Sequence, residues 1–172
     1  MKQVNSVGLA LLWIALAGAA PLAAQSQEPK PLVISAINKT AESAKAAGKE
    51  REDGAVARPG DVLGYSLAFT NRTSGRVNHV QFVDPLPKGL VYRTGSARAD
   101  KAVRIEYSID SGKSWAVEPM VAVMENGRRV VKPAPREAYS HIRWTVSEPL
   151  SPGAQVTAGF EAEVSQSASE AK

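Results

Sequence analysis

The sequence predicts an all-β fold, an antiparallel β-sandwich that follows an N-terminal export signal. Apolar and polar residues alternate with a period of two in several short segments, which is typical of half-buried antiparallel strands. Gly, Pro, Asn and Asp cluster between these segments as turn residues. No segment of the remaining chain shows the apolar stripe of an amphipathic helix. Because each strand has one apolar face, two sheets must pack these faces together.

Residues 1–24 have the organisation of a cleavable signal peptide. Lys2 supplies a positive charge, residues 7–20 form an apolar run, and small residues end at Ala24 before the polar Gln25. The run is shorter than the roughly 20 residues of a membrane-spanning helix, although an uncleaved anchor is the alternative. We therefore expect export to the periplasm or the cell surface or exterior, with no transmembrane segment after cleavage.

The mature chain is expected to form one sandwich domain over residues 32–164. A flexible leader, residues 25–31, precedes it and a disordered tail, residues 165–172, follows it. Residues 39–55 are rich in Ala, Lys and Glu and contain no large apolar side chain. They form a polar insertion that is either a short exposed helix or a mobile loop.

Individual segments predict the strands and one hairpin. In residues 141–146, Ile142, Trp144 and Val146 point to one face, which predicts that Trp144 lies in the core. Asn126 and Gly127 separate two apolar segments and predict a two-residue hairpin turn. The other expected strands lie at residues 32–37, 61–70, 78–83, 103–109 and 155–164.

Composition argues against several classes of protein. The chain has no Cys, and hence no disulfide, thiolate metal site or Cys nucleophile. Its formal net charge is +4, but the basic residues do not interleave with aromatic residues, so we expect no nucleic-acid partner. The two histidines, His79 and His141, are expected on polar strand faces. They are too few for a zinc site, which needs three or four ligands, and we expect no metal and no cofactor.

The acidic residues do not indicate an active site. Glycoside hydrolysis needs two carboxyl groups that face each other in a cleft. Asp84, Asp100, Asp110 and Glu118 all lie in or next to turn signals, where solvated acids are the ordinary arrangement. No nucleophile-elbow pattern is present either. We therefore expect a protein that is not an enzyme, with no catalytic residues.

Two turn motifs have a structural explanation. Pro59 and Gly60 are expected to set a tight turn, and Asp61 to cap it by accepting nearby backbone N–H groups. Asn71 ends the following segment, and we expect it in the left-handed conformation, which Asn tolerates.

These motifs resemble a known family. The sequence PGDVLGYSLAFTN at residues 59–71, DPLPKGL at 84–90, Trp144 and LSPG at 150–153 are together similar to the bacterial repeat domain known as domain of unknown function 11. The resemblance covers roughly residues 56–164. It implies an immunoglobulin-like sandwich on an exported, envelope or surface protein, and it implies no particular activity.

Residues 108–115 match the pattern S-x-D-x-G-x-[ST]-W and are similar to the Asp box of sialidase-type propellers. We expect a structural turn from Ser108, Asp110, Gly112 and Trp115, in which Asp110 accepts backbone N–H groups, Gly112 supplies a positive φ and Trp115 packs beneath. A propeller needs at least about four blades of four strands, so one box in this chain does not indicate a sialidase.

The sequence favours a non-catalytic exported module of the bacterial envelope or cell surface, with a structural or interaction role and an unknown envelope protein or glycan as partner. A carbohydrate-binding module is the alternative, suggested by the Asp box, by Tyr107, Trp115 and Trp144, and by the basic loops. An exposed aromatic platform would favour it, and burial of both tryptophans would count against it. A hydrolase is a remote alternative. The basic cluster is interpreted as a solvated loop or a contact to an anionic polymer, and comprises Arg128, Arg129, Lys132 and Arg136.

Overall fold

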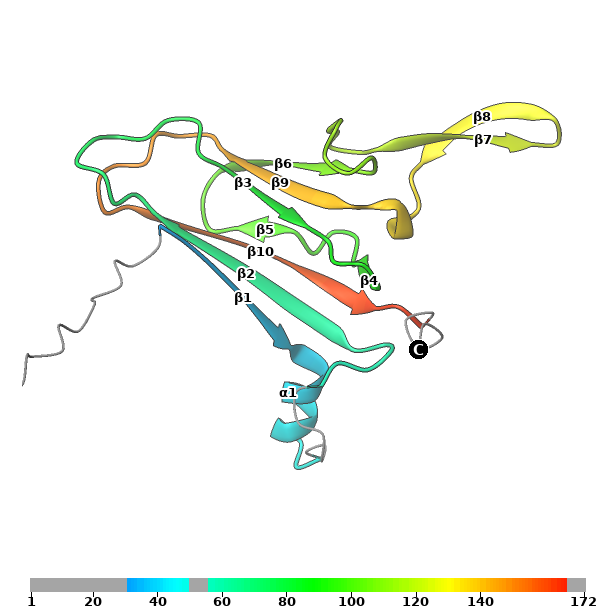
Figure 1. The fold of residues 1–172 in the computed structure, drawn as a ribbon, viewed down its shortest axis with the longest axis horizontal. Helices are drawn as coiled ribbons and strands as arrows, with labels where there is room; N and C mark the ends of the chain where they lie inside the picture. The colour runs from blue at the N-terminus through cyan, green and yellow to red at the C-terminus, as the bar shows by residue number, and fades with distance from the viewer. Residues whose placement is uncertain (1–30, 50–55, 167–172) are drawn as a thin grey trace, which may run out of the picture.

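The computed structural model describes residues 31–49 and 56–166. In this part the chain is mostly β, with antiparallel sheets that pack as a sandwich, which confirms the expected all-β class (Figure 1). The expected signal peptide at residues 1–24, residues 25–30 of the expected leader, and residues 167–172 of the expected tail lie outside the described residues.

The larger sheet has five strands, with β10 (Gln155–Val164) at its centre. β10 pairs with β2 (Val62–Thr70) on one side and with the short strands β4 (Leu90–Tyr92) and β5 (Arg98–Ala99) on the other. β1 (Leu32–Asn38) pairs with β2 and forms the edge of this sheet. The two long strands therefore form a platform for the second layer.

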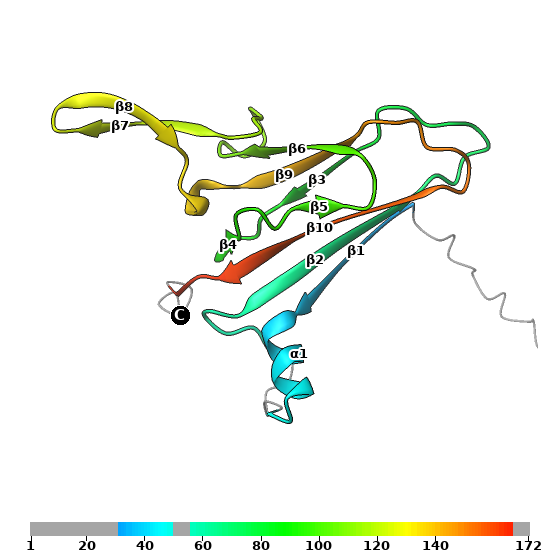
Figure 2. The same cartoon turned by 180° about the vertical axis from the view of Figure 1, so that it is seen from behind.

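The smaller sheet has three strands and lies above the larger one in Figures 1 and 2. β9 (His141–Val146) is central, between β3 (Gln81–Pro85) and β6 (Val103–Ser108). Ile34 of β1 lies next to the buried Leu67 on the core side but is 51% exposed, so the β1 edge of the larger sheet extends beyond the cover of the smaller one.

The inner faces of the two sheets form one hydrophobic core. Trp144 is 0% exposed, which confirms its prediction as a core residue. In the strand register it lies between Phe82 of β3 and Ile105 of β6. Its ring centroid is 6.0 Å from that of Phe160 of β10, so this contact joins the two sheets.

The structure departs from simple alternation in β6, and the expected position of His79 on a strand is wrong. Glu106 and Ser108, on the polar face of β6, are buried, because Arg143 and the Asp-box segment cover that face. His79 is not on a strand: β3 begins at Gln81, and His79 precedes it with a φ of 54°.

The structure decides between the two alternatives for the first part of the polar insertion. Residues Lys39–Ala46 form helix α1, and none of its residues is buried. Asn38 caps the helix by accepting the backbone N–H of Ala41 at 3.0 Å, as N-cap side chains do. Its amide nitrogen also donates to Asp61 Oδ2 at 2.8 Å. This pair of bonds ties the start of the helix to the turn before β2.

A two-stranded ribbon, the β7–β8 hairpin, projects from the sandwich (Figures 1 and 2). β7 (Met120–Glu125) and β8 (Arg128–Pro133) pair with each other. Asn126 and Gly127 join them with φ values of 52° and 76°, which confirms the predicted two-residue turn. The 3₁₀-helix η1 (Arg136–Ala138) then leads the chain back to β9.

Candidate functional site

The Asp-box segment after β6 is a turn closed by side-chain hydrogen bonds. Asp110 Oδ1 accepts the backbone N–H groups of Lys113 at 3.1 Å and Ser114 at 2.9 Å. The Ser114 hydroxyl donates to Asp110 Oδ2 at 2.5 Å. Ser108 Oγ donates to Asp110 Oδ1 at 2.7 Å and accepts the N–H of Gly112 at 2.9 Å, where φ is 83°. The structure thus places Ser108, Asp110 and Gly112 in one turn.

These bonds set the charge state of Asp110. They hold the pKa of the carboxyl well below its ordinary value, and the hydrogen bond from the Ser114 hydroxyl is the largest cause. The group is therefore an anion at neutral pH, with both oxygens bound to the turn. A general acid needs a pKa near the working pH, so this arrangement suits a turn acceptor and not a proton donor.

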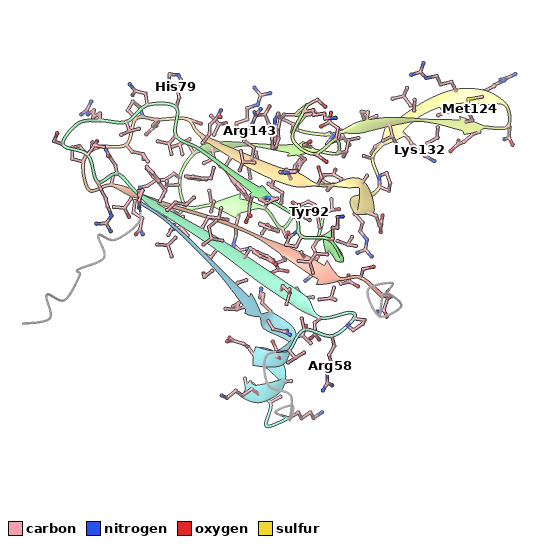
Figure 3. The ribbon with its side chains drawn as sticks, in the orientation of Figure 1. Arg58, His79, Tyr92, Met124, Lys132 and Arg143 are labelled. Carbon is pink, nitrogen blue, oxygen red and sulfur yellow. The ribbon has the colours of Figure 1, made fainter. Side chains whose placement is uncertain are left out.

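Trp115 lies half-buried on the outer side of the smaller sheet, and other groups cover its ring. The Arg143 guanidinium lies 4.4 Å from the ring centroid, and a Cβ added at Gly112 would lie 3.7 Å from Trp115 Cζ2. Arg143, which is labelled in Figure 3, is held by Glu106, whose Oε2 accepts its Nη2 at 2.7 Å. Glu106 also pairs with Arg104 at 3.0 Å. The ring is therefore part of a cation–π stack and not an open platform for a sugar.

Three tyrosines of the described residues pack against one another between the sheets. Tyr92, Tyr107 and Tyr139 form a cluster with ring centroids 5.2–5.4 Å apart. The hydroxyls of Tyr92 and Tyr107 are hydrogen bonded at 3.0 Å. Burial, followed by this hydrogen bond, raises the pKa of Tyr107. Together with the buried Trp144, this packing removes two of the three aromatic residues that suggested a carbohydrate site.

Asp61 holds the turn before β2. Its Oδ2 accepts the backbone N–H of Arg58 at 2.9 Å and the amide of Asn38 at 2.8 Å. Gly60 has a φ of 85°, and its N–H donates to the carbonyl of Val164 at 2.8 Å. The turn that follows Pro59 is therefore fixed to the end of the last strand.

Asn71 acts differently from its predicted role. It does not belong to the described non-glycine residues with a positive φ, so the expected left-handed conformation is wrong. Its side chain is 1% exposed and bridges two loops instead. The amide donates to the carbonyls of Gly75 at 2.8 Å and Leu150 at 2.9 Å, while Oδ1 accepts the N–H and hydroxyl of Thr73 at 3.0 and 2.7 Å. Full hydrogen bonding offsets the cost of burying this polar group.

Asp84 is an internal carboxyl, although the sequence indicated a solvated acid. It lies on the buried face of β3 at 7% exposure, and its Oδ2 has no hydrogen-bond partner. Burial raises its pKa, and the nearby His141 partly opposes that shift. Burial raises the pKa of Tyr65, and the Asp84 charge adds to that shift. A strand pattern alone does not reveal this residue, because Asp84 also precedes the turn-forming Pro85.

An open groove of about 250 Å³ lies over β10. Gly159 forms part of its lining, and a Cβ there would lie 2.6 Å from the Tyr65 carbonyl oxygen, so glycine is required. Asp100, which also lines the groove, is hydrogen bonded within the protein, since its Oδ1 accepts the N–H of Thr157 at 2.8 Å. The half-buried Tyr65 also lines the groove, and one face of its ring stacks on Phe160 with the centroids 4.8 Å apart. The other lining residues are Ser66, Arg98, Ala99 and Ala158.

The β7–β8 hairpin has one fully exposed apolar face. All six residues of β8 are exposed, and no third described strand pairs with the hairpin. On one face, Met120, Met124 and Val131 are 47%, 69% and 60% exposed. An isolated two-stranded ribbon is marginally stable in water, and an apolar surface of this kind is typical of contact with another molecule.

The same hairpin carries most of the basic cluster. Arg129 lies opposite Met124 at the outer end of the apolar face. Lys132, which is labelled on the hairpin in Figure 3, lies on the other face and pairs with Glu125 at 2.7 Å. Arg136 lies in η1 and pairs with Glu137 and Glu163. Sequence reasoning located the turn and the charges but missed the apolar face, because alternation does not show whether anything covers a strand.

Metal and membrane signals are absent from the described residues. In residues 31–49 and 56–166, no group of three or more His, Asp and Glu side chains is placed to hold a metal ion. No helix within these ranges has both the length and the apolarity to cross a bilayer.

Comparison of the chain with protein-family models, with curated proteins and with solved structures found no match.

Proposed function

We propose that this protein is a non-catalytic, exported interaction module of the bacterial envelope, and that the β7–β8 hairpin is its contact surface. Export follows from the signal-peptide pattern of residues 1–24. The resemblance to domain of unknown function 11 supports an immunoglobulin-like scaffold in the same compartment. The observation that carries the interaction role is the apolar face of Met120, Met124 and Val131, which the hairpin holds away from the sandwich.

The chemistry of the hairpin indicates the kind of partner. Met side chains adapt to irregular surfaces, and Arg is enriched in protein interfaces. Arg129 stands at the end of the apolar face, so an apolar patch with an acidic residue at its rim would complement it. We therefore propose an envelope protein as the partner.

The polar groups named above are held in hydrogen bonds and ion pairs within the protein, which supports the non-catalytic part of this proposal. Asp110 is bound within its turn, and Glu106 is bound by Arg104 and Arg143. The carbohydrate-binding alternative is weaker than the sequence suggested, because Arg143 covers the ring of Trp115. A glycan that binds the parent chain but does not bind Trp115→Ala would favour the carbohydrate-binding alternative again.

A capture experiment with matched variants tests this proposal. Tagged parent protein, a Met124→Ser and Val131→Ser double variant, and a Val117→Ser control are incubated with envelope extract. Val117 is 59% exposed but lies outside both hairpin strands. We expect the parent and the control to capture the same protein, and the double variant to lose it.

Direct binding measurements with the purified partner then give the loss of affinity in each variant. Interface truncations at central apolar residues typically cost about 1 kcal/mol or more each, so the double variant should bind at least roughly tenfold more weakly. Arg129→Gln should weaken binding and reduce its dependence on salt. Equal binding by the parent and the double variant would contradict the hairpin as the contact surface.

A further inference from the structure

A second surface, independent of the hairpin, lies along the free edge of β1. β1 is the terminal strand of the larger sheet and pairs only with β2 among the described strands. A free sheet edge exposes unpaired backbone groups, and proteins usually protect it with charges, Pro, short strands or a covering segment. The segment Leu32–Asn38 has seven residues, and none of them is charged or Pro.

Other edges of this protein do carry such protection. Ala116 pairs with Tyr107 through two backbone hydrogen bonds of 2.8 and 3.0 Å and covers part of the β6 edge. β8 carries Arg128, Arg129 and Lys132. β1 therefore differs from these edges in its chemistry.

The pairing register shows which backbone groups point outward. The N–H of Thr70 donates to the carbonyl of Pro31 at 2.9 Å, so in the antiparallel register this pair is hydrogen bonded. Hydrogen-bonded and non-bonded pairs alternate along such a ladder. The N–H and C=O groups of Leu32, Ile34 and Ala36 consequently point to the open edge.

The side chains along this edge are apolar and uncovered. Val33 and Ile34 are 57% and 51% exposed, on opposite faces of the strand. Ile34 lies next to Leu67 in the register, and Leu67 is 0% exposed. Ile34 is thus on the core side of the larger sheet but beyond the cover of the smaller one. Helix α1 leaves the sheet after Asn38, at the far end of the strand (Figures 1 and 2).

We propose that β1 pairs with β1 of a second copy of this chain, in an antiparallel arrangement about a two-fold axis at Ile34. Leu32 then lies opposite Ala36 of the second copy, and Ile34 opposite Ile34 of the second copy. Their outward N–H and C=O groups bond each other across the axis. Two copies of this strand can pair without electrostatic repulsion, because the strand carries no charge that would meet a like charge across the axis.

Sedimentation of the exported chain over a range of concentrations tests this dimer. We expect a reversible dimer in the parent and in the control Val117→Lys. In Ile34→Lys, two like charges meet across the axis and the apolar pair is lost, so the dissociation constant should rise about tenfold or more. Parent protein that stays monomeric at high concentration overturns the proposal, and so does a dimer that Ile34→Lys does not weaken.

A crosslink provides a second test that does not depend on weakening the dimer. The chain has no Cys, so an introduced thiol reacts without competition. Directly opposite residues in a bonded pair have Cα atoms about 5.5 Å apart, within the range of a disulfide. Oxidised Ile34→Cys should form a covalent dimer in high yield, whereas Val117→Cys should not. A covalent dimer of Val117→Cys but not of Ile34→Cys would place the contact elsewhere. If the Met124→Ser and Val131→Ser changes leave the Ile34→Cys crosslink intact, the β1 contact is independent of the proposed partner site on the hairpin.

Discussion

The pKa values of two acidic residues in this protein shift in opposite directions because their surroundings differ. Asp110 accepts several hydrogen bonds that favour the anion, and its pKa falls. Asp84 has a buried carboxyl oxygen without a partner, and its pKa rises. A carboxylate is stabilised by donors and destabilised by loss of water, so the two residues contribute to stability with opposite signs.

Asp110→Ala is expected to lower the melting temperature at neutral pH without removing any chemistry. The folded pKa of Asp110 is depressed, so its stabilisation is present above the ordinary pKa and is lost as the pH falls through the folded value. Thermal unfolding at neutral and strongly acidic pH measures the difference, which should shrink in acid. A variant that melts like the parent but loses binding to a glycan would contradict the structural role.

Asp84→Asn is expected to stabilise the protein at neutral pH. The folded pKa lies above the ordinary value of 3.8, so the charged form costs stability once the pH exceeds that folded pKa. The advantage of the variant should disappear as the pH falls below the ordinary value. Denaturant unfolding at both pH values checks this, and a variant less stable than the parent at neutral pH would show that the Asp84 charge is compensated.

Trp144→Ala is expected to cost about 3–5 kcal/mol, as typical for a large aromatic side chain in a core. Trp144 is 0% exposed and contacts Phe160 of the opposite sheet. This loss is comparable with the whole stability of many small domains. Denaturant unfolding measures it, and a folded variant with parental stability would be inconsistent with a core position.

At the scale of elements, the sandwich and the hairpin differ in what supports them. Each sandwich sheet buries one face against the other, while the β7–β8 ribbon pairs only with itself among the described strands. Val121 and Val123 are partly buried on one face, but Met124 and Val131 on the other are exposed. The ribbon therefore adds little to the stability of the core.

Replacing residues 120–133 by a short Gly-Ser linker is expected to leave the sandwich folded. The melting temperature should change by no more than a few degrees, since about 1 kcal/mol shifts it by roughly 2–8 °C in domains of ordinary size. Circular dichroism and thermal unfolding measure this. A variant that fails to fold would mean that the ribbon is part of the cooperative unit and not an appended arm.

At the scale of the whole molecule, the proposed export would place both proposed surfaces in the envelope. The parent chain expressed in a Gram-negative host should appear in the envelope fraction with Gln25 at or near its N-terminus, because the apolar run and Ala24 match the pattern of a cleavable signal peptide. N-terminal sequencing measures this directly. Exported protein that still begins with Met1 would indicate an anchor instead of a cleaved signal.

Much of the fold was predictable because it depends on short-range patterns. Ile142, Trp144 and Val146 alternate along one strand, and all three are buried. Asn126 and Gly127 determine a hairpin turn through their tolerance of positive φ. Such signals act within a few residues, so a single sequence contains them.

The remaining features depend on which segments meet in space. Glu106 is buried because Arg143 and Arg104 lie over it, and Asn71 is held by loops distant in sequence. No local pattern contains those partners.

The sequence alone determined the all-β class, the hairpin turn and the core position of Trp144, because strand periodicity and turn chemistry are local properties. The tertiary structure decided which strand faces stay uncovered. Ile34 and Met124 lie in apolar strands like many others, yet they are exposed, because the smaller sheet does not reach β1 and no described strand extends the hairpin sheet. Burial depends on all the neighbours of a strand, and these are assembled only when the chain has folded.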